Sequence, residues 1–321
     1  MIDNKIINFF KTHSDKYVSG EDLSDTLGIS RQALWKHIEK LREEGYEIVA
    51  SPHLGYRLES MPDILSELEL SFDLKTNIIG KKIYSYKEID STNDAAYRLA
   101  LSGEKEGSIV ISESQTKGRG RLGRNWVSPK DKGAYFSVIL RPDIMPRETS
   151  FITLFSSLAI CKTIREKIGL SAVIKWPNDV LINNNKICGI LTEMNGETDK
   201  INFVIIGIGI NINTKKELLP EGASSLMEEK GSFIPRVDLV KEIFRNIDRY
   251  YKHFIDEKRG LILREYKTLS AILDKRIKVS YHNRLIQGHA IDIDNEGALI
   301  IRMDSGLNER VLAGDVSILK K

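Results

Sequence analysis

The chain has 321 residues, of which 41% are hydrophobic and 29% are charged, a balance that predicts folding around two or three cores and excludes wholesale disorder. The longest apolar stretch, Phe203 to Ile210, has eight residues, far fewer than the roughly 20 that a membrane helix needs. An acidic residue at position 3 and the lack of a small-residue cleavage site are not typical of a secretory signal. We therefore expect a cytoplasmic protein with no membrane association. Its two cysteines, Cys161 and Cys188, support neither a disulfide framework nor a cysteine zinc site.

The formal net charge of +3 is nearly balanced, so the distribution of charge along the chain is more informative than its sum. The segment from Lys117 to Lys132 holds six basic side chains against one acidic one. A second basic group near the N-terminus comprises Arg31, Lys36, Lys40 and Arg42. Positive charge gathered in this way predicts anionic partners at both places.

Residues 1–60 have the pattern of a winged helix-turn-helix domain, in which three short helices precede a β-hairpin. Ser19 is placed to cap the second helix, which Gly28 ends. Ser30 is placed to cap a third helix, whose apolar residues recur at helical spacing. Two strands, over 46–50 and 55–58, would then form the wing.

The outer side of the third predicted helix carries side chains suited to phosphates and to base edges. The residues that we expect to contact DNA are Ser30, Arg31, Gln32, Lys36 and His37. The alternative is an ordinary solvated face on a small helical bundle. Because the caps, the glycine turn, the basic face and the trailing hairpin occur in the right order, we favour DNA binding.

The rest of the chain predicts a linker and two further domains. Residues 61–81 are expected to form a linker with one short helix. Over 82–270 strands alternate with helices, and short connections between neighbouring strands imply antiparallel pairing, so a mixed sheet of the α+β class is predicted. Residues 271–321 hold short strands and turn residues, which predicts a small β-barrel.

The segment from Gln115 to Trp126 is the most unusual part of the sequence, because three glycines alternate with three arginines in it. Glycines let the backbone amides turn inward, and arginines add fixed positive charge with forked donors. Such a loop can hold two anions that repel each other, as when a carboxylate attacks a phosphate. It lacks the Lys-Ser/Thr end of a P-loop, and the alternatives are a mobile surface loop or an RNA-binding tract.

Five short motifs occur in order between residues 91 and 211. They are Ser91-Thr92-Asn93, the Gly-Arg run from Gly118 to Trp126, Lys175-Trp176-Pro177-Asn178-Asp179, the stretch from Lys186 to Glu193, and Gly207-Ile-Gly209-Ile-Asn211. Together they resemble the motifs of the biotin protein ligases. With the N-terminal winged helix, the whole chain is similar to the bifunctional biotin ligases and biotin operon repressors of bacteria. The resemblance implies a class II synthetase-like ligase domain over 82–270 and an SH3-like barrel over 271–321.

The resemblance implies a two-step reaction that uses biotin, ATP and Mg²⁺. Biotin's carboxylate attacks the α-phosphate of ATP to give biotinyl-5′-adenylate and pyrophosphate. A lysine of a biotin carboxyl carrier protein then takes the biotinyl group. The resemblance also implies that the adenylate acts as corepressor, favouring a homodimer that binds operator DNA and represses biotin synthesis genes.

By the same resemblance, each motif supplies part of the site. The biotin pocket is expected to comprise Ser91, Thr92, Asn93, Gln115, Arg119, Gly120, Arg121 and Lys186. ATP and the adenylate are expected to contact Arg119, Arg121, Arg124, Trp126, Asn178, Lys186 and Asn211. The expected catalytic residues are Arg121, Lys186 and Asp179. No protein metal cage is expected, and Mg²⁺ would come with ATP, near Asn178 or Asp179.

Elementary electrostatics supports cationic residues in such roles, because a carboxylate and a triphosphate repel each other unless donors are aimed at the reacting atoms. A structural turn stays open as the alternative for Asp179, and a packing role for Trp126 and Trp176. The chain ends in two lysines where the family usually has an arginine near its C-terminus, so Lys320 is the expected substitute.

Other interpretations of the sequence are less well supported. The stretch from Phe203 to Asn213 imitates a dinucleotide fingerprint but lacks its third glycine, and the histidines have no zinc spacing. A transcription factor with a degenerate ligand domain is a second hypothesis, and a lipoate or octanoate ligase is a third. The intact set of Arg119, Arg121 and Lys186 argues against the second. The polar Ser91-Thr92 pair argues against the third, because those acyl chains lack a ureido ring.

Overall fold

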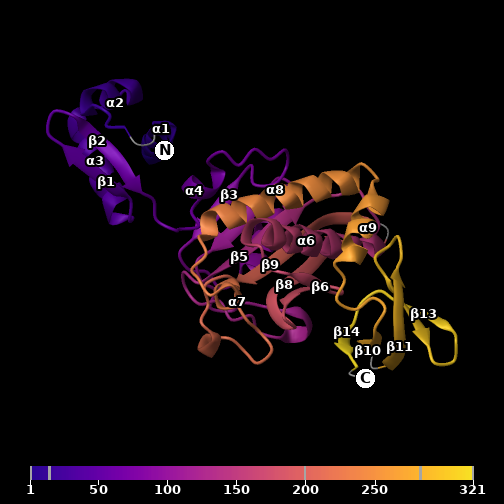
Figure 1. Ribbon diagram of the computed structural model, residues 1–321. Coiled ribbons are helices and arrows are strands. Elements are labelled where there is room, and N and C mark those ends of the chain that lie inside the picture. Colours follow the sequence, from indigo (N-terminus) through magenta and orange to yellow (C-terminus); the bar gives the residue numbers. More distant parts are fainter. Residues whose placement is uncertain (1, 14–15, 199, 282–283, 320–321) are drawn as a thin grey trace. The chain divides into compact units, whose positions relative to one another are not determined.

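The computed structural model describes residues 2–13, 16–198, 200–281 and 284–319 (Figure 1). The chain divides after residue 64 into two compact units. The first unit carries the predicted winged helix, and the second carries a large mixed sheet followed by a small antiparallel one. The predicted α+β fold class is therefore confirmed.

The first unit consists of three helices and a hairpin, α1 (Ile2–Thr12), α2 (Gly20–Leu27), α3 (Arg31–Glu43), β1 (Glu47–Ser51) and β2 (Gly55–Ser60). The Ser19 hydroxyl accepts hydrogen bonds from the first turn of α2, and Gly28 ends that helix with a φ of 65°. Such a left-handed residue is where glycine avoids the strain that a Cβ would cause. The apolar stripe of α3 is buried, as its spacing predicts.

The second unit is built on a seven-stranded sheet with the strand order β3-β4-β5-β9-β8-β7-β6. Its strands are β3 (Ile83–Tyr86), β4 (Ile109–Ser112), β5 (Gly133–Leu140), β6 (Val173–Lys175), β7 (Asp179–Ile182), β8 (Asn185–Gly196) and β9 (Ile201–Asn211). β3 and β4 are parallel, and all other neighbours in this sheet are antiparallel. The predicted mixed sheet is thus mostly antiparallel.

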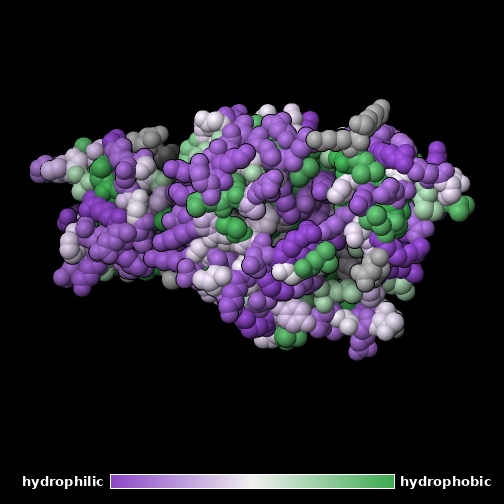
Figure 2. All heavy atoms as spheres, turned by 90° about the horizontal axis from the view of Figure 1, so that it is seen from below, coloured by the Kyte–Doolittle hydropathy of each residue, from purple (hydrophilic) through white to green (hydrophobic). Residues whose placement is uncertain are grey.

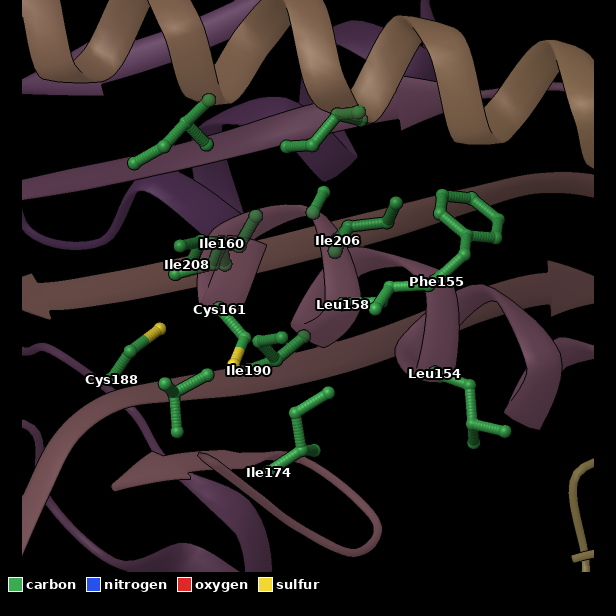
Figure 3. Packing of buried hydrophobic residues seen from close by; sticks show 14 of the residues in the cluster. Leu154, Phe155, Leu158, Ile160, Cys161, Ile174, Cys188, Ile190, Ile206 and Ile208 are labelled. Carbon is green, nitrogen blue, oxygen red and sulfur yellow. The ribbon is translucent and has the colours of Figure 1, made fainter. Parts of the chain in front are cut away.

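Helices cover both faces of this sheet. The helices of the second unit are α4 (Glu67–Ser71), α5 (Thr92–Leu101), α6 (Thr149–Thr163), α7 (Leu226–Lys230), α8 (Arg236–Ile255) and α9 (Arg259–Thr268). Alternate residues of the strands face opposite sides, so Val110 and Ile205 pack against α5, while Ile206 and Ile190 pack beneath α6 (Figure 3). α6 is buried along nearly its whole length because α8 lies over its outer side (Figure 1).

The segment over 61–81 differs from the predicted linker. From Leu65 onward it belongs to the second compact unit, and Leu65, Leu70, Leu74 and Ile79 are buried in the main core. The backbone N–H of Leu65 also donates to the buried Glu113 carboxylate at 2.6 Å. The amphipathic leucine pattern that predicts a short helix here therefore reflects packing into the core of the second unit.

A five-stranded antiparallel sheet with the order β13-β12-β11-β10-β14 completes the second unit. Its strands are β10 (Arg276–Tyr281), β11 (Arg284–Ile293), β12 (Leu299–Met303), β13 (Asn308–Val311) and β14 (Asp315–Ile318). The sheet shares the main core through Ala290 and Ile293, and Trp176 Nε1 donates to the Gly297 carbonyl at 3.0 Å. Lys320, predicted as a nucleotide contact, lies outside the described residues.

Hydrophobic side chains on the face drawn in Figure 2 lie in scattered groups amid hydrophilic surface. Within the described ranges, no helix combines the length and apolar character that spanning a membrane requires.

Candidate active site

A cavity lies where the start of α5, the loop before β5 and the strands β8 and β9 meet. Its lining includes every residue predicted for the biotin pocket, namely Ser91, Thr92, Asn93, Gln115, Arg119, Gly120, Arg121 and Lys186. These residues come from four separate segments of the sequence. The fold therefore brings together what the motifs list one after another.

Neutral polar groups line one end of this cavity. The Gln115 side-chain oxygen accepts from the Thr92 backbone N–H at 2.8 Å and from the Thr92 hydroxyl at 3.1 Å. The Ser137 hydroxyl lies 2.9 Å from Thr92 Oγ1 and 2.6 Å from Asn93 Oδ1. Ser91 caps α5 by accepting from the third residue of the turn. Because the side chains fix one another, hydroxyl and amide groups are held in place at this end.

Three glycines on β8 and β9 let side chains approach the sheet closely. A Cβ on Gly207 would lie 1.9 Å from Asn93 Oδ1, and one on Gly209 would lie 2.4 Å from the indole of Trp126. Gly189 pairs with Gly209 across the two strands, and its Cβ would lie 2.9 Å from the same indole. The glycines of the last two motifs thus make room for Asn93 and Trp126.

The glycine-arginine loop folds back on itself above the cavity. Its base is closed by a hydrogen bond of 2.9 Å from the Trp126 N–H to the Gly118 carbonyl, and the Gly120 N–H donates to the Arg124 carbonyl at 2.7 Å. Leu122, at the exposed tip, has a φ of 56°. The loop is therefore a short hairpin over the sheet, with its arginines projecting to different partners.

Cationic groups line the other end of the cavity. Arg121 Nη1 donates to Asn178 Oδ1 at 2.7 Å, and Lys186 Nζ lies 2.7 Å from Asp179 Oδ1 and 5.5 Å from the Trp126 ring centre. Burial lowers the pKa of the Arg121 guanidinium from its ordinary value, yet an arginine stays charged near neutral pH. A fixed positive charge therefore lines this part of the cavity.

A second cavity adjoins the first and shares Gly120, Arg121, Trp126, Asn178 and Lys186 with it. Every other residue predicted for the nucleotide lines this second cavity, except Arg119, which lines the first. The C-terminal sheet contributes as well, because Asp315 lines the cavity and pairs with Arg124. The Gly314 carbonyl accepts from Arg121 at 3.4 Å.

Arg119 lies at the rim, with its side chain 43% exposed. Its guanidinium donates twice to the Glu193 carboxylate, at 3.0 Å each, and once to Asp94 Oδ1 at 2.5 Å. Burial alone would lower the pKa of Arg119, but the two carboxylates outweigh burial and raise this pKa. Of the two arginines predicted to bind biotin and adenylate, only Arg121 therefore extends toward the cationic end.

Several residues that contact the side chains lining the cavities do not appear in the set predicted from the sequence, namely Ser137, Glu193, Asp94, Gly314 and Asp315, of which only Asp315 lines a cavity itself. Glu193 ends one of the five motifs and so carried a signal. Ser137 lies on β5, a strand that was not predicted from the sequence. Asp315 reaches the cavity only because the C-terminal sheet packs beside the loop.

The donor set suits a magnesium ion that comes with phosphate. Asn178 Oδ1 already accepts from Arg121, and one Asp179 oxygen faces Lys186. Among the residues that the structure describes, three or more His, Cys, Asp or Glu side chains do not gather as a metal site. Mg²⁺ commonly takes one or two carboxylates and completes its shell with phosphate oxygens and water.

The candidate DNA-binding surface of the first unit is built around α3. Ser30 caps this helix by accepting from the Ala33 N–H at 3.2 Å, and Arg31, Gln32 and Lys36 are exposed on it. His37 instead turns toward α1, where its Nδ1 lies 2.6 Å from Asp3 Oδ1.

Two more residues of α3 belong to this description. Lys40 reaches the other oxygen of the same Asp3 carboxylate at 2.6 Å. Trp35, which is not among the predicted DNA contacts, is 53% exposed beside Lys36.

Comparison with known proteins follows the same division of the chain. Residues 85–211 match the model of the Biotin/lipoate A/B protein ligase family, residues 3–57 that of an HTH domain, and residues 272–319 that of the Biotin protein ligase C terminal domain. The chain is 37% identical over 317 residues to the bifunctional ligase/repressor BirA of Bacillus subtilis, covering 98% of this chain and 97% of that protein. It is 31% identical over 308 residues to BirA of Escherichia coli, covering 94% and 93% respectively.

Solved structures of relatives agree with these matches. The biotin protein ligase of Aquifex aeolicus in complex with biotin and ATP superimposes with a TM-score of 0.63 at 28% identity, covering 75% of this chain and all of that one. Because these two relatives are more than 30% identical and align over nearly the whole length of both chains, the chain belongs to the bifunctional ligase/repressors, and its central region matches the biotin/lipoate A/B protein ligase family.

Proposed function

We propose that this protein is an ATP-dependent biotin–protein ligase that also represses transcription in response to biotin. The observation that carries the proposal is one cavity with a neutral polar end and a cationic end, joined to a second cavity at Arg121, Asn178 and Lys186. The lining of the first cavity suits a small molecule with a polar head and a carboxylate tail. The lining of the second suits a nucleotide, with its phosphates at the shared residues.

The polar end is suited to hold the ureido ring of biotin. Ser91, Thr92, Asn93 and Gln115 offer hydroxyl and amide groups there, and their mutual hydrogen bonds hold them in position. A site built to hydrogen-bond a polar head rejects an analogue that lacks it, because its own buried groups would lose their partners. This end therefore favours biotin over lipoate or octanoate, whose acyl chains lack a ureido group.

The cationic end is suited to the first reaction step. A carboxylate oxygen of biotin attacks the α-phosphorus of ATP, the bond from that phosphorus to the bridging oxygen breaks, and pyrophosphate leaves. Arg121 and Lys186 would hold the two anions together and stabilise charge that develops between them. Magnesium, when bound with ATP, would neutralise phosphate charge near Asn178 or Asp179.

The second step transfers the biotinyl group to a carrier protein. The lysine ε-amine of a biotin carboxyl carrier protein attacks the acyl carbon of biotinyl-5′-AMP, and AMP leaves with the electrons of the acyl–phosphate bond. Asp179 faces the cavity and pairs with Lys186. We propose that it keeps the Lys186 ammonium aimed at the acyl phosphate through both steps.

A transfer assay tests the ligase proposal. Purified protein given radiolabelled biotin, ATP, Mg²⁺ and a carrier domain should label the carrier, and Arg121→Ala should lower the rate about 100- to 1000-fold. Arg98→Ala is the matched control, since Arg98 lies on α5 with its side chain largely exposed. The absence of labelling by the parent protein, or equal rates for both variants, would contradict the proposal.

The repressor proposal rests on the first unit. Two winged helices of a homodimer would present α3 to two half-sites of operator DNA near biotin synthesis genes. Bound biotinyl-5′-AMP would favour the dimer by ordering the interface. We further propose that the protein works in the cytoplasm, where Cys161 and Cys188, both free and buried, are kept as thiols.

Fluorescence anisotropy with DNA from upstream of the organism's biotin synthesis genes tests DNA binding. Lys36→Ala should weaken binding and reduce the slope of log affinity against log salt by about one. Lys5→Ala on α1 is the control, because it removes the same exposed charge from another helix. An equal loss for both variants would indicate that α3 is not the reading helix.

A further inference from the structure

Glu193 is the most heavily engaged carboxylate near the first cavity, yet the proposed chemistry does not use it. It lies on β8 and accepts two hydrogen bonds from Arg119, each 3.0 Å long. The two parallel bonds form the bidentate arrangement in which guanidinium and carboxylate geometries match. Asn93 Nδ2 donates to the same carboxylate at 2.7 Å.

The partners of Glu193 belong to two different parts of the site. Arg119 belongs to the base of the glycine-arginine loop, one residue after the Gly118 carbonyl that closes it. Asn93 belongs to the wall of the cavity, where its side-chain oxygen accepts from Ser137 at 2.6 Å. Glu193 therefore joins the loop to the cavity wall through one side chain.

Arg119 does not contact the cationic end in this arrangement. Asp94 at the start of α5 takes a third hydrogen bond from its guanidinium at 2.5 Å, so two carboxylates surround one cation at the rim. An incoming biotin carboxylate would be repelled by these two groups, whereas Arg121 and Lys186 lie deeper, at the junction of the cavities. Arg119 is therefore placed to hold the loop, whereas Arg121 is placed to contact the reacting anions.

We propose that Glu193 is a positioning residue, which holds the loop over the cavity through Arg119 and so slows the escape of what the cavity contains. The identity of that content, biotinyl-5′-AMP, rests on the proposed function. The contact itself does not, because it is formed by side chains of this chain alone.

The size of the effect follows from exposure. Arg119, Asp94 and Glu193 are all partly exposed, and ion pairs of this kind change an equilibrium constant by about two- to fivefold. A change of that size alters how often the loop opens. It does not alter the charge at the reacting atoms, which Arg121 and Lys186 provide.

The retention of the adenylate is the first readout. In the full-length protein, Glu193→Gln keeps an acceptor for Asn93 but removes the charge that binds Arg119, and it should release biotinyl-5′-AMP about fivefold faster. The single-turnover rate of adenylate formation should stay within about twofold. Glu197→Gln, in the exposed turn after β8, is the matched control and should change neither rate.

A double variant separates this contact from general loss of structure. If Arg119→Ala and Glu193→Gln both act by breaking the same ion pair, the double variant should release adenylate no faster than Arg119→Ala alone. Fully additive effects would overturn the proposal. So would a Glu193→Gln variant that releases adenylate at the parent rate.

Limited trypsin digestion without any ligand tests the contact independently of the ligase proposal. Cleavage within 119–124 should be about two- to fivefold faster in Glu193→Gln than in the parent or in Glu197→Gln. Equal cleavage would overturn the positioning role even in an active ligase. Faster cleavage in a protein that forms no adenylate would uphold the contact and reject the proposed function.

Discussion

The approach of Asn93 and Trp126 to bare strand backbone sets the shape of the candidate biotin cavity. Both side chains occupy space that a Cβ on Gly207 or Gly209 would take. The two glycines lie on β9 with ordinary extended backbone, so their role is steric and does not depend on an unusual φ. The cavity is therefore sensitive to the smallest possible addition on this strand.

We expect Gly207→Ala to weaken biotin binding by at least about tenfold, because its Cβ would overlap Asn93 Oδ1 and displace a group of the polar end. Isothermal titration calorimetry with biotin measures this directly. Gly260→Ala on α9 is the control, since its Cβ would meet nothing within 4 Å and alanine favours helix by about 1 kcal/mol. Unchanged affinity in Gly207→Ala would show that the polar end lies elsewhere.

At this scale the sequence predicts residue types better than their directions. The predicted pocket residues line one cavity because the motifs lie at strand ends and turns that converge. The different orientations of Arg119 and Arg121 could not be predicted, since both lie in one short loop of similar residues. Their directions depend on Glu193 and Asn178, which lie more than 50 positions away in the sequence.

Side-chain contacts with α1 fix the position of α3, the candidate DNA-recognition helix. Asp3 on α1 binds both His37 and Lys40 of α3. Asp3 therefore fixes the orientation of the His37 ring through Nδ1. Any contact of His37 with DNA, as predicted from the sequence, depends on this contact with α1. Burial alone would raise the pKa of Asp3, but the hydrogen bonds from Lys40 and His37 outweigh burial and lower this pKa.

The free energy of unfolding of the first unit should therefore decrease as the pH becomes acidic. Because the folded pKa of Asp3 lies below the unfolded value of about 3.9, its contribution is present above that value and is lost as pH falls through the folded pKa. After correction for the pH dependence of the intrinsic exchange rate, peptides from 2–43 should lose more hydrogen-exchange protection between pH 5 and pH 3 in the parent than in Asp3→Asn. Asp25→Asn, an exposed change on α2, should follow the parent.

α8 is tied to the sheet by a buried ion pair. Arg236 Nη1 lies 2.5 Å from Glu113 Oε2, and the side chains are 2% and 6% exposed. Arg236→Met would leave the Glu113 carboxylate buried without this partner, so we expect a loss of about 3–5 kcal/mol in the free energy of unfolding. Urea denaturation measures it, with the exposed Arg264→Met on α9 as control. A loss below about 1 kcal/mol would contradict this account.

Elements were predicted where their pattern is periodic and capped, as in α2, α3 and α5. β5 was not predicted, because its residues are buried on both faces and such a run lacks the alternation that marks a half-exposed strand. The sequence predicts a linker over Leu65 to Ile79, where the structure has buried leucines, because their packing partners are distant in sequence. Tertiary packing, which local patterns do not contain, decided both cases.

On the scale of the whole molecule, the C-terminal sheet completes the second cavity, the candidate nucleotide site. Asp315 at the start of β14 pairs with Arg124 of the loop, and Gly314 accepts from Arg121. The order of domains along the chain is predictable from composition and turns. The meeting of the loop with residues nearly 200 positions later is not, because it depends on how two sheets pack.

We expect Asp315→Ala to raise the KM for ATP about two- to fivefold, since the partly exposed pair with Arg124 is lost. The KM for biotin should stay the same, because Asp315 does not line the first cavity. Steady-state adenylation assays measure both constants. Asp304→Ala, in the turn between β12 and β13, loses an exposed pair with Arg276 and should leave both constants unchanged. An equal rise for the two variants would speak against a local role.

The three tryptophans lie in different environments, so their fluorescence can report on different parts of this protein. Trp35 is largely solvated on the first unit, and Trp176 is sealed in the core. Trp126 lies over Gly209 with the Lys186 ammonium near its ring, where a bound molecule would change its surroundings. In a variant with Trp35→Phe, a change of fluorescence emission on adding biotin therefore arises at Trp126, whose indole borders the cavity. Trp126 is thus an intrinsic fluorescence probe of ligand binding in this cavity.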